Sequence, residues 1–531
     1  MMTCHMQFSS RARRGWFGLA IFLLLKTSHC FMSPNGGSEL LRSYLGDEVI
    51  GRGDEATGRA FRQTLLNNGD ISYTLRLKVG GQTLEVIPDT GSFDLLLVST
   101  RCQQGCGDRR LLYSSQKSLT YEKGSVFCHH SFGSGGTDAI EAYDDMRVGP
   151  LQAGRQVFWE VIQADMPILE YSDFQGIMGL GPPASSVKLA QMEESEVSGQ
   201  LEEIESTGMS TEKQRQVVEN YREVREHTEQ ALSIVQSLGI DSFSYCLSRN
   251  VGGPGVLVLR DMDPQIRPPG MFETIEDMGK FYWSTEMRNV GFGPLPSDEL
   301  SGRTRLGCHK KACTVVMDTG TSLLAVPTKA AMQVEAVLDK WRSLTGNCSD
   351  LSALPNFEFM MGGKRFSLPP ESYIGEITGD FNALDSALLH HMPHLEHGIK
   401  LANLLRENRS ADEESGLGQL TEDPCVPLFM VMDDLSPEGQ DTWVMGMPFF
   451  REYYTTFSFQ SGPTDGRPGA RSMSFAKADK NCEPMEQPEL ERTEMFSMPV
   501  MQQDRPRRER LKVDVSKLQL PRWVARRKNK L

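Results

Sequence analysis

The tripeptide Asp-Thr-Gly occurs twice in this 531-residue chain, and a hydroxyl residue follows each copy. The copies are Asp89-Thr-Gly-Ser92 and Asp318-Thr-Gly-Thr321, and apolar runs of strand length, Leu84–Ile87 and Thr314–Met317, precede them. A single tripeptide of this kind occurs by chance in a long chain. Two copies in the same local context indicate a duplicated unit, in which two equivalent turns follow two equivalent strands.

Two equivalent turns can bring Asp89 and Asp318 face to face. Like charges a few Å apart cannot both ionise, so such a pair shares one proton and titrates as a unit. One carboxylate can then serve as base and the other as acid toward a water molecule between them. The pattern therefore predicts acid–base chemistry on water.

The other motif residues suit this arrangement. Glycine lets two loops approach without a Cβ clash, and a buried threonine can hydrogen-bond to the opposite loop. The final hydroxyl can donate to the neighbouring carboxylate and favour its ionised form. These roles are expected for Gly91 and Gly320, Thr90 and Thr319, and Ser92 and Thr321, in that order. Pro88 removes a backbone donor just before Asp89, so we expect a strand edge or a bulge there.

From about residue 64 to 482, two insertions apart, the chain resembles the pepsin-like aspartic endopeptidases of family A1. The resemblance is carried by Phe174-Gln-Gly-Ile-Met-Gly-Leu-Gly, by Asp318-Thr-Gly-Thr-Ser-Leu-Leu-Ala-Val-Pro-Thr and by Trp443-Val-Met-Gly-Met-Pro-Phe-Phe. It implies an all-β, bilobal fold with helical insertions, and hydrolysis of peptide bonds in extended polypeptides without a cofactor or metal. Aspartic proteases are the established case of a shared-proton carboxyl pair. A catalytically silent binding or inhibitor module on the same fold is the alternative.

In this family a hairpin flap carries a tyrosine that bonds a tryptophan behind the first motif. Here Phe132 stands in the tyrosine position, followed by Gly133 and Ser134 as the substrate-binding tip, and Leu96 stands in the tryptophan position. Replacing both partners of a hydrogen bond can be close to neutral, so the exchange predicts a repacked apolar flap. Some apicomplexan relatives of the plasmepsins are similar in this respect and in their long acidic insertions.

Eleven cysteines are present, and Cys4 and Cys30 lie in the N-terminal segment. The resemblance implies disulfides Cys102–Cys106, Cys308–Cys313 and Cys348–Cys425. Phe243-Ser-Tyr-Cys246-Leu resembles the nepenthesin-like branch, which suggests that Cys246 pairs with Cys482 and leaves Cys128 over. A zinc site would need further ligands close to the paired cysteines, which argues against that reading.

Basic residues precede an apolar run at Trp16–Leu25, and small residues follow it at Ser28–Cys30, so residues 1–30 read as a secretory signal peptide. A buried helix or strand and an uncleaved signal anchor are the alternatives, and no other transmembrane anchor is expected. The secretory reading places the protein in the secretory pathway, outside the cell or in an acidic organelle. It would also make the sequons at Asn347 and Asn408 usable for glycosylation. A net charge of −14 argues against nucleic acid as a partner. The resemblance implies protein or peptide substrates, and a monomer is expected.

The expected organisation combines the two lobes that the resemblance implies with the composition of the segments around them. Residues 31–63 are a short prosegment or a disordered N-terminus, 64–262 the N-terminal lobe, 263–482 the C-terminal lobe, and 483–531 a disordered basic tail whose basic runs could be processing sites or contacts with an anionic surface. Alternation after Ile71 predicts a strand that ends at a Gly80-Gly81 turn.

Two insertions interrupt the lobes, at about 184–239 and 376–424. In the first, a capping box at Thr211 and Gln214 and a stop at Gly239 predict a helix whose apolar face packs on its own lobe or binds a partner. That face is expected to consist of Val217, Tyr221, Val224, Thr228, Ala231, Val235 and Leu238. The second carries four histidines within His390–His397, for which a solvated loop is favoured over a metal site because Pro393 interrupts a regular helix.

Overall fold

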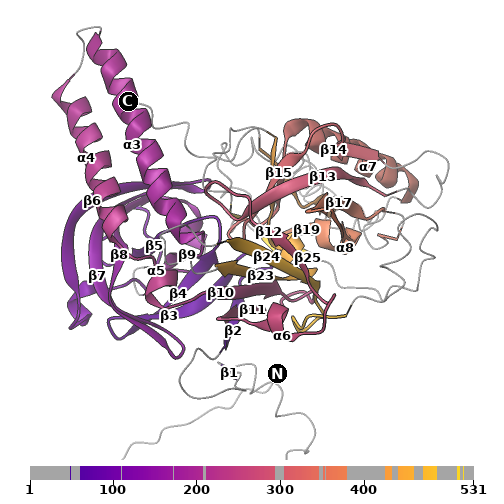
Figure 1. Ribbon diagram of the computed structural model, residues 1–531, viewed down its shortest axis with the longest axis horizontal. Coiled ribbons are helices and arrows are strands. Elements are labelled where there is room, and N and C mark those ends of the chain that lie inside the picture. The colour runs from indigo at the N-terminus through magenta and orange to yellow at the C-terminus, as the bar shows by residue number, and fades with distance from the viewer. Residues whose placement is uncertain are drawn as a thin grey trace, which may run out of the picture. The chain divides into compact units, whose positions relative to one another are not determined.

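The computed structural model describes the chain from residue 60 to residue 519 with gaps, plus a short strand before it. The described residues are 48–49, 60–108, 111–171, 173–206, 211–293, 304–345, 351–352, 354–378, 425–432, 441–459, 470–486, 511–514 and 518–519. The predicted signal segment, the two sequons, the histidine run and Cys348 lie outside these residues. Figure 1 shows the arrangement of the labelled elements.

Strands dominate the first half of the described chain, and most of them join one large sheet. Its order on this side is β2-β3-β4-β9-β5-β8-β7-β6, with β1 on β2. The predicted alternating strand is β3, which turns into β4 through Gly80 and Gly81, both at positive φ. The bounds are β1 Glu48–Val49, β2 Phe61–Asn67, β3 Tyr73–Val79, β4 Gln82–Asp89, β5 Leu95–Val98, β6 Glu122–Phe132, β7 Gly135–Val148, β8 Leu151–Asp165 and β9 Gly176–Gly179.

The second half builds a separate sheet in the order β18-β17-β13-β15-β22-β16-β21, with β14 on β13. Its strands are β13 Ser284–Phe292, β14 Thr304–Gly307, β15 Cys313–Met317, β16 Leu324–Val326, β17 Phe357–Met361, β18 Lys364–Leu368, β21 Phe429–Val431 and β22 Thr442–Met445. The accompanying helices are α7 Thr328–Thr345, α8 Pro370–Tyr373 and α11 Met447–Phe450. The two halves thus form the two lobes of a bilobal, strand-rich fold.

Strands from both ends of the chain connect the lobes. The large sheet continues from β2 through β11, β10, β23 and β24 to β12, so that β23 and β24 from the end of the body pair next to strands of the first half (Figure 1). These strands are β10 Ser242–Leu247, β11 Gly255–Leu259, β12 Glu273–Glu276, β23 Tyr453–Phe459 and β24 Arg471–Lys477. One buried apolar cluster runs from Phe61 in the first lobe to Phe475 in β24. The lobes therefore share a core as well as a sheet.

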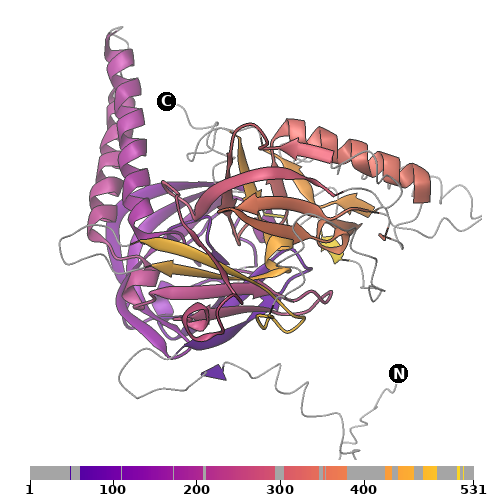
Figure 2. The same cartoon turned by 45° about the vertical axis from the view of Figure 1, so that its right-hand side comes forward.

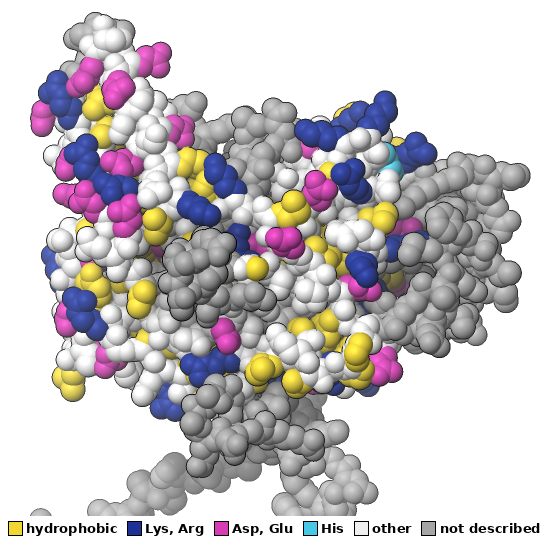
Figure 3. All heavy atoms as spheres, viewed as in Figure 1, with side chains coloured by type: hydrophobic (Ala, Val, Ile, Leu, Met, Phe, Trp, Pro, Cys, Tyr) yellow, Lys and Arg dark blue, Asp and Glu magenta, His cyan; other side chains and the backbone are white. Residues whose placement is uncertain are grey.

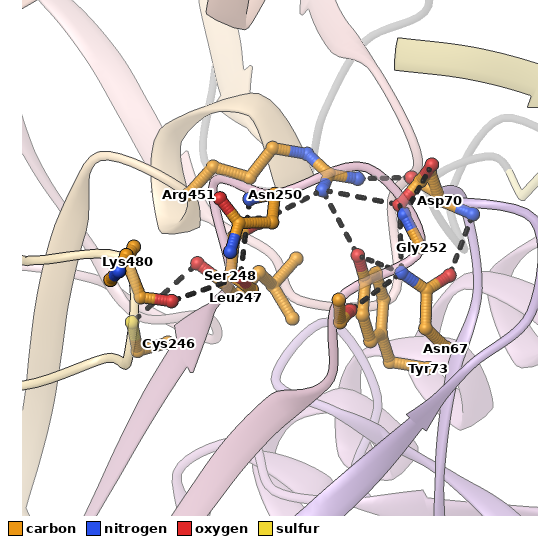
Figure 4. A network of polar contacts seen from close by, with 11 residues as sticks. Asn67, Asp70, Tyr73, Cys246, Leu247, Ser248, Asn250, Gly252, Arg451 and Lys480 are labelled. Carbon is orange, nitrogen blue, oxygen red and sulfur yellow. Dashed lines mark hydrogen bonds and ion pairs between the residues drawn. The ribbon is translucent and has the colours of Figure 1, made fainter. Parts of the chain in front are cut away.

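A buried polar network joins the residues just before β23 to the residues at the start of β3 (Figure 4). The Arg451 guanidinium lies 3.8 Å from the Asp70 carboxylate, donates to the Asp70 carbonyl and donates to the Tyr73 hydroxyl at 2.9 Å. Asn67 and the Gly252 N–H donate to the same Asp70 carboxylate. Both charged side chains are 4 % exposed, so the pair is almost fully removed from water.

The first insertion is helical, but it is not one helix. A capping box at Thr211 starts α4 as predicted, and Gly239 stops the segment at φ 60°. The helix breaks at Ala231, however, because Ser233 caps a second short helix with its own capping box. The helices of the first lobe and its insertion are η1 Ser115–Lys117, α2 Ile168–Tyr171, α3 Pro183–Ser206, α4 Glu212–Gln230, α5 Ile234–Ser237 and α6 Asp263–Ile266.

Helices α3 and α4 form a hairpin whose base packs on the first lobe. Asn220 donates to the Phe127 carbonyl in β6, and Val218 is the buried apolar residue of α4. The predicted apolar face is therefore wrong at Val217, which is exposed, because the helix is turned toward Val218. At the ends of the two helices far from the lobe, the Arg215–Glu205 ion pair joins α4 to α3. Figures 2 and 3 show these far ends standing off the strands and carrying charged side chains of both signs.

Part of the predicted disordered tail is a strand. β25, Leu511–Asp514, pairs in parallel with β19, Ile374–Thr378, and β19 also pairs with β20, Cys425–Pro427. Leu511 and Leu518 are both buried. The disorder prediction needs correcting for these residues, because the segment finds backbone and apolar partners in the second lobe that its own composition does not reveal.

Within the described residues, three disulfides are formed, Cys102–Cys106, Cys308–Cys313 and Cys246–Cys482. These match three of the pairings that the family resemblance implies. The third joins β10 to the end of the body across 236 residues of sequence. The expected Cys348–Cys425 pair falls outside the described residues.

Candidate active site

The two Asp-Thr-Gly turns lie at equivalent places in the two lobes. β4 ends at Asp89 and runs parallel to β9, while β15 ends at Met317, directly before Asp318, and runs parallel to β22. The strand-like runs before the motifs are thus strands, as predicted. Each carboxylate stands at the carboxyl end of a buried strand, a position that the rest of the lobe fixes.

Pro88 fits into this frame without a bulge. β4 pairs with β9 through Asp89 with no shift of register, so of the two expected alternatives the structure has the strand edge and not the bulge. On its other side β4 pairs with β3 only as far as Val86, and the Pro88 carbonyl accepts a hydrogen bond from the Thr319 hydroxyl. The missing N–H therefore costs no ladder bond, because Pro88 lies beyond the end of β3 pairing.

The two threonines exchange hydrogen bonds between the loops. The Thr90 N–H donates to the Thr319 hydroxyl at 3.0 Å, and the Thr319 N–H donates to the Thr90 hydroxyl at 2.9 Å. Each hydroxyl then donates onward to a carbonyl of the opposite strand, that of Met317 or that of Pro88. Because all these groups are buried, each loop holds the other in place.

The two glycines let the loops meet. A Cβ added at Gly91 would lie closer than 3.0 Å to the Asp318 carboxylate, and one added at Gly320 would lie equally close to the Asp89 carboxylate. Neither contact is with a flexible chain end, since both carboxylates are buried and held. Any residue other than glycine at either position would push the two carboxylates apart.

The two final hydroxyls of the motifs differ in the structure. Thr321 donates to Asp318 Oδ2 at 2.8 Å, as expected. Ser92 does not donate to Asp89, and its buried Oγ finds no partner within the described part of the chain. Asp89 accepts from the Gly91 N–H at 2.8 Å, and its carboxyl group hydrogen-bonds with that of Asp318. The two carboxylates therefore have unequal surroundings.

Electrostatics favours one shared proton on the pair. Burial, and after it the Asp89 carboxylate, raises the pKa of Asp318 well above its ordinary value. Hydrogen bonds from Thr321 and from the Gly320 N–H act in the opposite direction, and burial outweighs them. A carboxyl pair with one raised pKa holds a single proton over a range of pH in which an isolated aspartate is ionised.

The predicted flap is a long hairpin of β6 and β7. Phe132 pairs with Gly135, which leaves Gly133 and Ser134 as a two-residue turn at its tip. Phe132 is 5 % exposed and belongs to the same buried cluster as Leu96. The count along the sequence thus places an apolar side chain at the flap and another on the wall behind the first motif.

Sequence reasoning missed the tryptophan that supports this wall. Trp159 on β8 is the register partner of Leu96 on β5, so an indole lies one strand away from the family's usual position. Its ring meets the His130 ring of β6 edge-on at 5.1 Å and the His227 ring of α4 at 5.4 Å. The His227 Nδ1 lies 3.1 Å from Glu141 of β7. The insertion therefore contacts the flap through the rings of His227, Trp159 and His130. No local sequence motif predicts this contact.

Comparison with known proteins agrees with this geometry. Residues 72–382, more than half of the chain, match the model of a family described as eukaryotic aspartyl protease. The chain belongs to this family. It is similar to pepsin A of Bos taurus (24% identity over 79% of this chain and 90% of the relative) and to gastricsin of Homo sapiens (27%, over 73% and 79%). It is also similar to vacuolar protease A of Neurospora crassa (27%, over 59% and 69%).

This aspartyl protease is thus an aspartic-type endopeptidase with peptide substrates. Because the identities are low, the roles of the insertions, the flap packing and the C-terminal segment have to be inferred from the structure of this chain. Among the described helices of the protease, none is long and apolar enough to cross a membrane. Within the same residues, no group of three or more His, Cys, Asp or Glu side chains is placed to hold a metal ion.

The Thr321 hydroxyl gives a pH-dependent prediction for the protease. Its hydrogen bond lowers the pKa of Asp318, so Thr321→Ala should raise that pKa further. The protonated form then persists to higher pH, and the alkaline limb of the kcat/KM profile should move upward by about one pH unit. Thr321→Ser keeps the hydroxyl and is the matched control. A limb that stays in place in Thr321→Ala would show that this bond does not set the titration.

The flap makes a second prediction. Phe132→Tyr places a hydroxyl in an apolar cluster, so we expect kcat/KM for one peptide to fall by about tenfold. Adding Leu96→Trp offers that hydroxyl an indole N–H, and the double-mutant cycle should show favourable coupling of about 0.5–3 kcal/mol. Strict additivity over the four variants would mean that the two side chains do not meet.

Proposed function

We propose that Asp89 and Asp318 activate a water molecule that adds to the carbonyl carbon of a peptide bond. The ionised carboxylate takes a proton from the water as it attacks, and the protonated one gives its proton to the carbonyl oxygen. Proton transfer to the amide nitrogen then releases the amine. The raised pKa of Asp318 supports its role as the acid, and the ionised partner is then Asp89.

The observation that carries this proposal is the mutual exchange between Thr90 and Thr319. Four hydrogen bonds tie each loop to the opposite strand, and the glycine contacts hold each carboxylate against the other loop. Fixing two catalytic groups before substrate arrives removes the cost of aligning them in the transition state. A chain that only bound peptides would gain nothing from two buried carboxylates, whose burial disfavours their charge.

The flap supplies the second part of the proposal. We place an extended peptide against the tip formed by Gly133 and Ser134, with the Phe132 and Leu96 cluster as the apolar support beneath it. Apolar contacts suit a hairpin whose tip moves, because they are non-directional and can re-form in more than one position. The active protein is proposed to work in the secretory pathway or in an acidic organelle, where the pair keeps its proton.

Digestion of a peptide library by the purified chain over a series of pH values tests this function. Cleavage should require several residues on each side of the scissile bond, reach its maximum in the acidic range and vanish in an Asp89→Asn variant prepared in the same way. Cleavage that persists in that variant, or an optimum confined to alkaline pH, would overturn the proposed chemistry.

A further inference from the structure

The C-terminal segment meets the loop that carries Asp318. After β25 the chain reaches Leu518 and Gln519, which are 2 % and 6 % exposed. Leu518 belongs to a buried cluster that also contains Phe93, four residues after Asp89, and Leu323, five residues after Asp318. Leu518 thus shares one buried cluster with a residue that follows each of the two aspartates.

Gln519 binds Ser322 through both of its backbone polar groups. Its N–H donates to the Ser322 hydroxyl at 2.9 Å, and its carbonyl accepts from the Ser322 N–H at 3.2 Å. Its side chain donates to the Ser72 hydroxyl in the other lobe at 3.1 Å. The Ser322 hydroxyl in turn donates to the Ile71 carbonyl. One tail residue is therefore bound by its backbone to one lobe and by its side chain to the other.

These contacts lie on the loop that carries Asp318. Ser322 directly follows Thr321, whose hydroxyl holds Asp318. The N–H and hydroxyl of Ser322 together engage the C=O and N–H of one residue, so they can hold the backbone of a bound peptide. A peptide placed for hydrolysis has to lay its backbone along the loops that carry the dyad. Gln519 already uses donor and acceptor groups on one of them.

We propose that the C-terminal segment, through β25 and residues 518–519, acts as an intramolecular inhibitor of this protease. β25 anchors the segment on β19, and Leu518 and Gln519 occupy part of the peptide-binding position beside Asp318. Because the segment is tethered, its effective concentration at the site is far above that of a free peptide in solution. The substrate must displace Gln519 from Ser322, so the segment lowers activity by competition. This inference rests on the proposed function of the dyad.

Truncation after Asp514 tests the proposal while keeping β25. This variant lacks Leu518 and Gln519, and we expect kcat/KM for a short peptide to rise by about tenfold over the full chain, chiefly through a lower KM. In the full chain, Gln519→Pro removes the N–H that Ser322 accepts and should raise kcat/KM similarly. Gln519→Ala keeps both backbone bonds, loses only the bond to Ser72 and should have a smaller effect.

A synthetic peptide of residues 511–531 supplies the second measurement. Added to the truncated chain, it should bind with a measurable Kd and inhibit hydrolysis competitively, whereas the peptide with Gln519→Pro should do neither. Equal kcat/KM for the full chain, the truncated chain and Gln519→Pro, with no inhibition by the peptide, would overturn the proposal. The melting temperature of each variant shows whether the fold is kept, and Gln519→Pro decides the matter if truncation lowers it.

The binding measurement separates this proposal from the proposed function. If every variant is inactive but the labelled peptide still binds the truncated chain, the dyad chemistry is wrong and the docking site stands. Suppose that the truncated chain is active, loses its activity with Asp89→Asn and is neither bound nor inhibited by the peptide. The dyad chemistry is then supported, and the inhibitor proposal is wrong.

Discussion

Asp89→Asn and Asp318→Asn should each lower kcat/KM for peptide hydrolysis by about 10³-fold, because a single carboxyl group cannot supply both the base and the acid. Asparagine keeps the volume that Gly91 and Gly320 pack against, so the loops should stay in place. Initial rates on one peptide at the optimal pH give the measurement. Residual turnover above about one part in a hundred would contradict the assignment.

The same variants carry a control based on stability. Folding raises the pKa of Asp318, so this group stabilises the fold when protonated, below the ordinary aspartate pKa of about 3.9. The contribution is lost as the pH rises through the raised pKa of the folded protein. The melting temperature of the wild type should therefore fall relative to that of Asp318→Asn as the pH increases. A constant difference would mean that Asp318 titrates normally.

Arg451→Met should destabilise the protein by about 3–5 kcal/mol, because it leaves the Asp70 carboxylate buried without its cation. The Tyr73 hydroxyl loses a donor in the same step. Urea unfolding monitored by circular dichroism measures the change. Asp70→Asn added to Arg451→Met removes the unpaired charge and should recover part of the loss, which identifies the charge and not the lost volume as the cause.

Arg76→Met is the matched control for this prediction. Arg76 pairs with Glu85 at 3.4 Å, but its side chain is 55 % exposed, and an exposed pair contributes only about 0–1 kcal/mol. The two variants make the same substitution in a buried and in an exposed ion pair. Similar losses in both would show that the network in Figure 4 does not hold the lobes together.

The parts of the site that could be predicted are those that depend on local sequence. A strand before each motif, the Gly80-Gly81 turn and the capping box at Thr211 all follow from a few adjacent residues, and the structure has them. The threonine and glycine contacts could be anticipated because the repeat implies that two identical loops face each other.

Features that depend on distant partners escaped prediction. Trp159 reaches the wall through register with another strand, and Gln519 reaches Ser322 across 197 residues. The break in the insertion helix depends on competition between two caps, since Ser233 starts a new helix before the first pattern ends. The Ser92 hydroxyl makes no hydrogen bond to Asp89 within the described residues, although the similar motifs predicted one in each loop.

The hydrogen bonds between Thr90 and Thr319 also mean that the site can form only after both halves of the chain have been synthesised. The first loop is synthesised 229 residues before the second, and its buried N–H and hydroxyl at Thr90 have their partners only there. Until the second half has folded and docked, the first aspartate has no rigid setting and no neighbour to share a proton with. On the proposed dyad chemistry, a chain whose second half has not yet folded therefore has no proteolytic activity, and this activity arises only as the last long-range contacts form.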